Sequence, residues 1–219
     1  MKTYLFFAYR EWAINIYQWL SNNGDSWKLI TVDKFCNKEI IDDIKPDIIF
    51  FVGWSWVVPK EITDAYPCLC LHPSPLPKYR GGSPIQNQII NGETDSAATI
   101  FKMGDEMDAG DIIKQSPLSL DGYLDDILNR IEAVGRNLLY EIIEDYTWDA
   151  VQGKVQDDSV ATWYPRRRPE YSELRPIDLT EFSAKQIYDM VRCLQPPYPE
   201  VFINCKEGKL ILEKVRYEL

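Results

Sequence analysis

The sequence predicts an α/β fold: a Rossmann-like, doubly wound, mostly parallel sheet followed by a short C-terminal helix and a β-hairpin. Over roughly the first 70 residues, short apolar segments with strand character alternate with segments whose apolar residues recur at helical spacing. Strands separated by helices at this rhythm imply parallel crossovers. The chain has 219 residues, of which 45% are apolar and 26% charged, as expected for one globular domain with a small appendage.

The N-terminal half supplies four predicted strands and two predicted helices. Apolar residues recur at helical spacing over residues 11–22, and a shorter helix is predicted over residues 38–44. Residues 47–52, Asp-Ile-Ile-Phe-Phe-Val, form an almost continuous apolar run that is typical of a strand buried on both faces. The predicted strands cover residues 4–8, 27–32, 47–52 and 68–72.

The C-terminal half continues with strands, a long helix and a hairpin. The long helix is predicted over residues 124–144, and the pair Ser183 and Gln186 forms a capping-box pattern that predicts the start of another helix. We expect a main domain over residues 1–163 and an appendage of linker, helix and hairpin over residues 164–219. The predicted strands of this half cover residues 97–103, 111–118, 201–204 and 209–215, the last two forming the hairpin.

Charge and composition argue against several classes of protein. Lys and Arg number 24 against 34 Asp and Glu, which gives a net charge of −10. Such a surface repels phosphate backbones, so we expect no nucleic-acid partner. The apolar runs are too short for a membrane span and the N-terminus lacks a signal-peptide pattern, so no membrane partner is expected. Five cysteines without framework spacing favour a reduced, cytoplasmic protein. No Gly-x-Gly-x-x-Gly or Walker pattern supports a dinucleotide or a nucleoside triphosphate.

His72 is the only histidine in the sequence, so any imidazole chemistry must use it. It ends the predicted strand over residues 68–72, and open α/β sheets bind their ligands at the carboxyl ends of strands. The segment that follows, residues 73–82, is rich in Pro and Gly and suits close approach of a substrate. A structural histidine that closes a strand end is the alternative, and position alone does not separate the two.

A series of motifs from this strand onward is similar to the signature of a known enzyme family. His-Pro-Ser-Pro-Leu-Pro-Lys-Tyr-Arg-Gly at residues 72–81 is followed by Ser-Pro-Ile-Gln at 83–86 and Met-Gly-Asp-Glu-Met-Asp-Ala-Gly-Asp at 103–111. Tyr-Pro-Arg-Arg at 164–167 and Arg-Cys-Leu-Gln-Pro-Pro-Tyr-Pro at 192–199 continue the match in order. The chain therefore resembles the formyltetrahydrofolate-dependent N-formyltransferases, in particular the sugar N-formyltransferases that are related to methionyl-tRNA formyltransferase.

The resemblance implies a catalytic domain over residues 1–163 and N10-formyltetrahydrofolate as co-substrate. By position, His72 and Asp108 match the catalytic His and Asp of the family, and Cys70 stands where the family has Asn. When an amine attacks the formyl carbon, a neutral imidazole can take its proton and a carboxylate can orient the imidazole. A thiol is a weaker donor to the developing oxyanion than an amide, so another donor substitutes or the catalyst is slow or altered. For Asp108, a loop-stabilising Asx turn is the alternative.

Cys68, Cys70 and His72 alternate along one predicted strand and therefore share one of its faces. Such a set raises the alternative of zinc ligation. No fourth ligand and no Cys-x-x-Cys pair stand nearby in the sequence. Because buried cysteines on a core strand are the commoner case, we expect no metal.

Two loops are expected to hold the pteridine ring of the folate, as the resemblance implies. Large aromatic side chains in one of them suit stacking on a flat ring, with core packing as the alternative. The candidates are Trp54, Ser55, Trp56 and Val57 in one loop and Met103, Gly104, Asp105 and Asp108 in the other. The candidates for binding the acceptor substrate are Ser74, Lys78, Tyr79, Arg80 and Arg166. Cations among these would hold a diphosphate, and for the arginines of residues 166–168 a solvated linker is the alternative.

Three acceptors are compatible with the resemblance: methionyl-tRNA, glycinamide ribonucleotide and nucleotide-linked amino sugars. The acidic charge and the short segment after Pro199 disfavour tRNA, whose enzymes carry a further C-terminal domain. The arginine linker and hairpin tail resemble the sugar enzymes, so we expect a dTDP- or UDP-linked amino sugar of the kind used in lipopolysaccharide biosynthesis. The alternatives are a catalytically impaired paralogue that binds folate or sugar nucleotide, and a formyltransferase for another small amine.

The predicted hairpin has apolar faces and an edge that needs covering. Pairing with the same hairpin of a second subunit would bury this edge, so a homodimer is expected. Folding back onto the chain's own core is the alternative.

Overall fold

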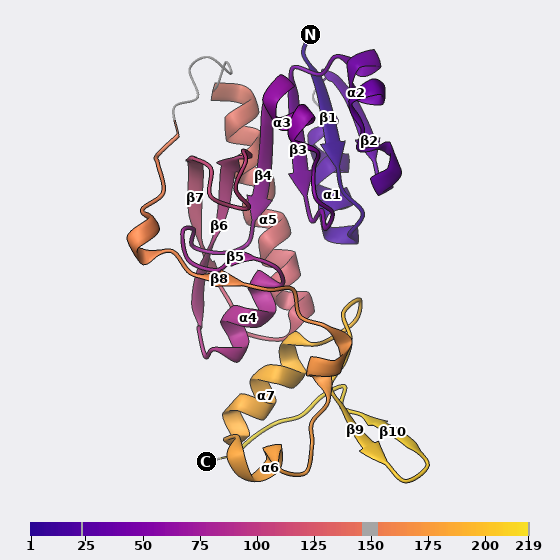
Figure 1. The fold of residues 1–219 in the computed structure, drawn as a ribbon, viewed down its shortest axis with the longest axis vertical. Coiled ribbons are helices and arrows are strands. Elements are labelled where there is room, and N and C mark those ends of the chain that lie inside the picture. The colour runs from indigo at the N-terminus through magenta and orange to yellow at the C-terminus, as the bar shows by residue number, and fades with distance from the viewer. Residues whose placement is uncertain (23, 146–152, 219) are drawn as a thin grey trace.

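The computed structural model describes residues 1–22, 24–145 and 153–218, and its centre is a six-stranded sheet (Figure 1). The strand order is β2-β1-β3-β4-β6-β7. The first four of these strands run parallel, whereas β6 is antiparallel to both of its neighbours. The predicted α/β class with a mostly parallel sheet is therefore confirmed. The strands are β1 (Thr3–Phe7), β2 (Ser26–Ile30), β3 (Ile48–Val52), β4 (Cys68–His72), β6 (Asp95–Lys102) and β7 (Ile112–Ser119).

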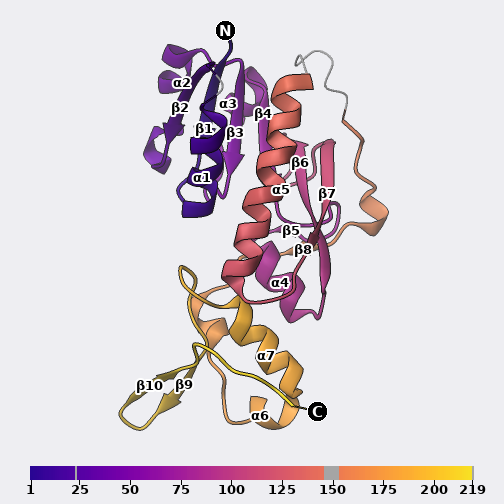
Figure 2. The same cartoon turned by 180° about the vertical axis from the view of Figure 1, so that it is seen from behind.

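Helices cover both faces of the sheet, because successive side chains of a strand point to opposite faces. Phe6 packs into the cluster that contains the apolar side chains of α1 and α5, and these two helices lie in front of the sheet in Figure 2. Its neighbour Phe7 packs into a second cluster, on the side of α2 and α3. The helices of this region are α1 (Glu11–Leu20), α2 (Lys38–Ile44), α3 (Lys60–Ala65), α4 (Pro84–Ile90) and α5 (Leu124–Asp145), with a 3₁₀ turn η1 (Asp33–Phe35).

A short parallel pair outside the main sheet joins the loop after β4 to a much later segment (Figure 1). It consists of β5 (Arg80–Gly81) and β8 (Trp163–Tyr164). The approach is so close that a Cβ on Gly81 would lie 2.3 Å from the carbonyl oxygen of Tyr164. Only glycine fits there, and its φ of +95° also favours glycine. We call residues 153–164, which include the 3₁₀ turn η3 (Asp158–Val160), the strap.

The C-terminal segment forms a small unit at the end of the molecule opposite the N-terminus (Figure 1). Its helix α7 begins with the predicted capping box, in which Ser183 Oγ accepts from Gln186 N at 3.2 Å and Gln186 Oε1 accepts from Ser183 N at 2.8 Å. Met190 and Val191 of α7, and Leu194 directly after it, join the same hydrophobic cluster as α1 and α5. The elements are η4 (Pro169–Ser172), α6 (Asp178–Glu181), α7 (Ala184–Cys193), β9 (Phe202–Cys205) and β10 (Gly208–Ile211).

A buried ion pair within α7 orients an arginine whose guanidinium group bonds the turn before α5. Arg192 and Asp189 are 4% and 2% exposed, and Arg192 Nε donates to Asp189 Oδ1 at 2.7 Å. Arg192 Nη1 also donates to the carbonyl oxygens of Leu120 and Gly122. Removing one partner of such a pair costs about 3–5 kcal/mol, because the other charge stays buried. The unit is therefore attached to the rest of the chain by the hydrogen bonds of a buried arginine as well as by apolar packing.

The structure differs from the expectations in detail. Helices α3 and α4 form where no helix was expected. The last strand ends at Ile211 and not at residue 215, because Val215 leaves the hairpin and exchanges two hydrogen bonds with Tyr123 Oη. No helix in the described residues is long and apolar enough to span a membrane. The division between residues 163 and 164 stays a prediction.

Candidate active site

A cavity of about 620 Å³ opens at the carboxyl ends of β1, β3 and β4, where open α/β sheets bind their ligands. The loops after these three strands line it, together with a loop from Met103 to Asp108, part of the strap and the segment around Tyr198. The loop after β6 folds back across β4, because Met103 N bonds the carbonyl of Cys68 and Asp108 reaches His72. The topology thus brings residues from six separate segments to one site.

His72 and Asp108 face each other in the wall of this cavity. His72 Nδ1 lies 3.6 Å from Asp108 Oδ2, and the two side chains are 7% and 14% exposed. The other ring nitrogen, Nε2, lies 2.9 Å from the carbonyl oxygen of Tyr79. Because a carbonyl oxygen only accepts, Nε2 carries the hydrogen of the neutral ring and Nδ1 keeps its lone pair. The pair can therefore take up a proton at Nδ1 and stabilise the resulting charge with the carboxylate.

The Asp108 carboxylate is held by the backbone of another loop. Its Oδ2 accepts from Gly81 N at 2.8 Å. Asp108 itself has a φ of 56°, in the left-handed region that Asp tolerates better than most residues. In an Asx turn the side chain bonds its own loop, whereas here it bonds the loop after β4. The Asp108 carboxylate therefore links the loop after β6 to the loop after β4.

Cys70 precedes His72 by two residues on β4 and also lines the cavity. Burial raises the pKa of the Cys70 thiol well above its usual value, and the nearby Asp108 carboxylate raises it further. The thiol therefore stays protonated at neutral pH and is a weak hydrogen-bond donor. The structure places Cys70, as the sequence predicts, at the same site as the His72–Asp108 pair.

Cys68 lies further back on the same strand and is 2% exposed. Burial, together with the neighbouring Cys36, raises the pKa of its thiol to about 12. Within the described ranges, no three His, Cys, Asp or Glu side chains come together in a way that could hold a metal ion. Cys68 packs in the cluster on the side of α2 and α3.

An aromatic group stands at the loop after β3. The ring centroid of Trp56 lies 4.7 Å from that of Trp54 and 4.6 Å from that of Tyr9, and Tyr9 Oη donates to Ser55 Oγ at 2.6 Å. The indole N–H groups of Trp12 and Trp54 are buried and lack a hydrogen-bond partner among the described residues. Since Trp12, Trp54 and Trp56 all line the cavity, this wall suits a flat ring with a polar edge.

The remaining predicted folate residues line the same cavity. Val57 is 82% exposed on the loop after β3. Met103, Gly104 and Asp105 belong to the loop after β6. The Asp105 carboxylate forms an ion pair with Lys60 of α3. The two loops that the sequence selects therefore lie at one cavity. The ion pair of Asp105 also links the loop after β6 to α3, the helix that follows the loop after β3.

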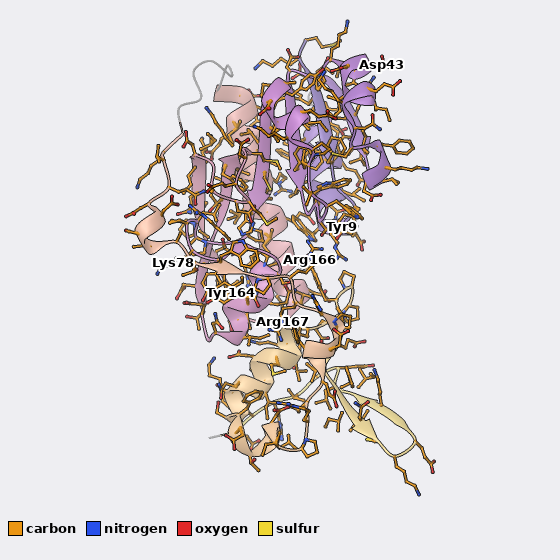
Figure 3. All side chains as sticks on the ribbon, viewed as in Figure 1. Tyr9, Asp43, Lys78, Tyr164, Arg166 and Arg167 are labelled. Carbon is orange, nitrogen blue, oxygen red and sulfur yellow. The ribbon has the colours of Figure 1, made fainter. Side chains whose placement is uncertain are left out.

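The structure separates the predicted acceptor-binding residues. Arg166 lines the cavity. In Figure 3, Lys78 lies well apart from Arg166. The predicted residues that do not line the cavity are Ser74, Lys78, Tyr79 and Arg80.

Three of these four side chains hold the loop after β4 in its conformation. Ser74 Oγ donates to the Lys78 carbonyl at 2.9 Å, and Tyr79 Oη donates to Glu93 Oε1 at 2.9 Å. The guanidinium group of Arg80 donates to side chains of the strap. Contact of the four residues with an acceptor stays a prediction. In the structure, the side chains of Ser74, Tyr79 and Arg80 stabilise the loop after β4.

Sequence reasoning missed several polar residues of the cavity, among them Arg10, Gln86 and Tyr198. The guanidinium carbon of Arg10 lies 4.6 Å and 4.8 Å from the ring centroids of Tyr9 and Tyr198. Neither Arg10 nor Arg166 takes part in an ion pair with any residue that the structure describes. The available signal was the position of Arg10 two residues after the first predicted strand, where ligands of such sheets bind.

Comparisons with known proteins agree with this geometry. A family model described as formyl transferase matches residues 31–143, which include Cys70, His72 and Asp108. Over 169 residues the chain is 34% identical to the methionyl-tRNA formyltransferase of Lysinibacillus sphaericus, covering 75% of this chain and 52% of that protein. The chain thus spans about half the length of the curated relatives it matches.

Solved structures extend the comparison. A methionyl-tRNA formyltransferase from Clostridium thermocellum is 30% identical with a TM-score of 0.86, and the match covers 96% of this chain and 91% of that one. A 4-N formyltransferase from Francisella tularensis shares the fold at 18% identity, with a TM-score of 0.75 and 99% of both chains covered.

Proposed function

The chain belongs to the formyl transferase family, and from this premise we propose that it transfers a formyl group from N10-formyltetrahydrofolate to the amino group of a nucleotide-linked amino sugar. The observation that carries the proposal is the His72–Asp108 pair in the wall of the cavity, with 3.6 Å between Nδ1 and Oδ2. Transfer to an amine needs a group that accepts a proton as the new bond forms. The pair supplies such a group at a site large enough for ligands.

The residues of the cavity fit a reduced folate. Trp54 and Trp56 offer flat apolar faces. The indole N–H groups of Trp12 and Trp54, which have no hydrogen-bond partner in the part of the chain that the structure describes, suit the polar edge of a pteridine ring. When bound, N10-formyltetrahydrofolate supplies the formyl group that is transferred. We assign its binding to residues 54–57 and 103–105, together with Asp108.

His72 is proposed to accept the proton that the acceptor amine loses. Its Nε2–H is bound to the Tyr79 carbonyl, which fixes the ring and leaves Nδ1 as the nitrogen that accepts. Asp108, oriented by Gly81 N, then stabilises the imidazolium from 3.6 Å. A positioned acid–base group of this kind contributes about 10²–10⁴ in rate.

Cys70 is proposed to stand on the side where negative charge develops on the formyl oxygen. Its raised pKa keeps it a neutral S–H, which donates only weakly. The proposal therefore includes a slow chemical step unless a further donor contributes. A catalytically impaired folate-binding protein is the alternative that follows from the same residue.

Arginines at the cavity support a phosphate-bearing acceptor. Arg10, Arg166 and Arg167 all line it, and Arg10 is held between the rings of Tyr9 and Tyr198. In a chain with a net charge of −10, arginines at a cavity that have no carboxylate partner among the described residues suit a diphosphate. We therefore place the diphosphate of the sugar nucleotide at these arginines and its amine at His72.

Methionyl-tRNA is the second candidate acceptor, because the curated relatives at up to 34% identity carry that name. The acidic net charge weighs against it, since a polyanion of that size would meet a repulsive field over most of the surface. A dTDP- or UDP-linked sugar brings only two phosphates to a local group of arginines.

A turnover assay separates these candidates. The purified protein is mixed with N10-formyltetrahydrofolate and, in separate reactions, with dTDP- and UDP-linked 3-amino and 4-amino sugars and with methionyl-tRNA, and products are identified by mass spectrometry. Formylation of an amino-sugar nucleotide without formylation of methionyl-tRNA supports the proposal. Formylation of methionyl-tRNA would identify methionyl-tRNA as the acceptor in place of the amino sugar. Tetrahydrofolate binding without any product supports the binding-protein alternative.

We further propose a cytoplasmic homodimer that forms through the hairpin. Leu210 and Ile211 of β10 are 52% and 43% exposed. Strand β9 bridges Glu173 through Phe202, so β10 carries the outer edge of this small sheet. Pairing with the hairpin of a second copy covers both the edge and the apolar side chains.

A further inference from the structure

We propose that Gln156 of the strap is a positioning residue that sets the Asp108 carboxylate against His72. The inference rests on the proposed function, in which the distance between these two side chains controls the proton transfer. It adds a residue that lies outside both folate loops and outside the lining of the cavity.

The Gln156 side chain is 7% exposed and uses its whole hydrogen-bonding capacity. Its Nε2 donates to the carbonyl oxygens of Asp108 at 2.9 Å and Gly110 at 2.7 Å. Its Oε1 accepts from Arg80 Nε at 3.0 Å and from Arg80 Nη2 at 2.8 Å. Because a guanidinium only donates and carbonyls only accept, the carboxamide has a single satisfied orientation. Gln156 therefore fixes the backbone on both sides of Ala109.

The loop needs this support. Asp108 has a φ of 56°, a backbone conformation that costs roughly 1–2 kcal/mol for a residue with a side chain. Residues 104–107, which precede it, are exposed. Gly110 packs so closely on β6 that a Cβ would lie 1.8 Å from the Lys102 carbonyl oxygen. Asp108 is thus a strained residue between an exposed segment and a tightly packed glycine.

The contacts of Gln156 close a ring that includes the catalytic pair. Arg80 bonds Gln156, Gln156 bonds the Asp108 backbone, and the Asp108 carboxylate bonds the backbone of Gly81, the neighbour of Arg80. The residue before Arg80, Tyr79, binds the His72 ring through its carbonyl. Residues 79–81 therefore bind both the His72 ring and the Asp108 carboxylate. Gln156 fixes the distance between this segment and the Asp108 backbone.

The test replaces Gln156 by Glu. The carboxylate still accepts from Arg80, but it has no hydrogen to donate to the two carbonyls, so the Asp108 backbone loses its anchor. The matched control is Asp158→Ala, because Asp158 also accepts from Arg80, at 2.8 Å, but is 77% exposed and has no bond to the Asp108 loop. A displacement of about 1 Å at a reacting group can cost about 10²-fold in rate. In Gln156→Glu we expect kcat to fall about 10–100-fold, with little change in the KM for the folate or in the KM for the acceptor. In Asp158→Ala we expect kcat to stay within about twofold of the wild-type value.

The single histidine gives a readout that does not depend on turnover. With ¹⁵N-histidine labelling, only His72 contributes imidazole nitrogen resonances. We expect Gln156→Glu to move these resonances from the wild-type position toward that of Asp108→Ala, while Asp158→Ala leaves them unchanged. Wild-type resonances in a folded Gln156→Glu variant would overturn the inference, whatever the acceptor of the enzyme is.

A double-mutant cycle checks that Gln156 acts through Asp108. In an Asp108→Ala background, Gln156→Glu should lower kcat by less than about threefold, because the group it positions is gone. If the two losses multiply in full, or if the loss follows the thermal stability of each variant, Gln156 is a general structural residue and the inference fails. If the wild type forms no product with any acceptor, the proposed function fails, and the resonances of His72 still decide the inference.

Discussion

The ring of His72 donates from Nε2 to the backbone carbonyl of Tyr79 at 2.9 Å. This bond selects the tautomer, since a carbonyl oxygen leaves the ring no choice about which nitrogen carries the hydrogen. The free nitrogen is then Nδ1, which lies 3.6 Å from Asp108 Oδ2. A backbone group of the loop after β4 therefore determines which atom acts as the base.

Replacing His72 removes the proposed proton acceptor. His72→Asn has no basic nitrogen, so kcat should fall by about 10²–10⁴. Asp108→Asn should fall in the same range. Steady-state rates with the acceptor found in the product screen check this, and circular dichroism confirms the fold. Retention of more than about a tenth of the wild-type kcat excludes His72 as the acid–base group.

Cys70→Asn restores the residue type that the sequence resemblance expects beside His72. The amide supplies an N–H where the neutral thiol donates weakly, so kcat should rise about tenfold or more. Stability should drop slightly, because a polar amide replaces a residue that behaves as a small hydrophobe. Single-turnover rates and thermal melts measure the two effects. An unchanged, already fast rate shows that another donor is present, and a loss of activity gives the thiol a role of its own.

Arg10 and Arg166 should control affinity for the phosphate-bearing acceptor. Arg166→Leu removes a cation from the cavity wall, and because hydrogen bonds to charged groups are worth about 1.5–3 kcal/mol, KM for the sugar nucleotide should rise about 10–100-fold with a small change in kcat. Arg10→Leu should act in the same direction. The control is Lys28→Leu on β2, an exposed cation outside the cavity, for which KM should stay near the wild-type value. Equal effects at Lys28 and Arg166 would move the diphosphate away from the proposed arginines.

The hairpin prediction concerns assembly. Leu210→Asp places a charge on the exposed apolar face of β10 and should convert a dimer to a monomer without loss of the fold. Light scattering at micromolar concentration measures the mass of both proteins. The control is Lys206→Asp in the turn between β9 and β10, which changes the charge without removing an apolar side chain. A wild-type protein that is already monomeric under these conditions rejects the dimer.

The sheet could be predicted from the sequence because its strands carry strong local patterns. The five residues of β3 are all buried and all apolar, which leaves a continuous run. Helix α4 escaped prediction for the opposite reason. Besides Ile85 and Ile89 it buries Gln86, Asn87 and Gln88, and Gln88 Nε2 donates to the Pro73 carbonyl. In a helix of seven residues with three buried polar side chains, the apolar pattern is too short to predict a helix. The pair β5–β8 is two residues long on each side and joins distant segments, so it leaves no periodic signal.

The residues of the candidate site also fall into those that the sequence could identify and those that it could not. His72 was evident because it is unique and ends a strand, and the motif resemblance selected Asp108 and Cys70. Arg10 and Gln156 were not selected, because their roles depend on which segments meet in space. Gln156 in particular has the composition of an ordinary polar residue in a loop, and only its bonds to Arg80 and Asp108 distinguish it.

The strap has a consequence for the order in which the molecule is made. The ribosome adds His72 and Asp108 to the growing chain before it adds the strap. Residues of the strap pair with the loop after β4 and bond the Asp108 backbone. A nascent chain that ends before residue 153 therefore already holds both reactive side chains, without the segment that brings them into register. On the roles proposed for these residues, we expect activity only after the strap has been made. We expect a fragment released earlier by stalling or proteolysis to be inactive, although it carries both reactive side chains.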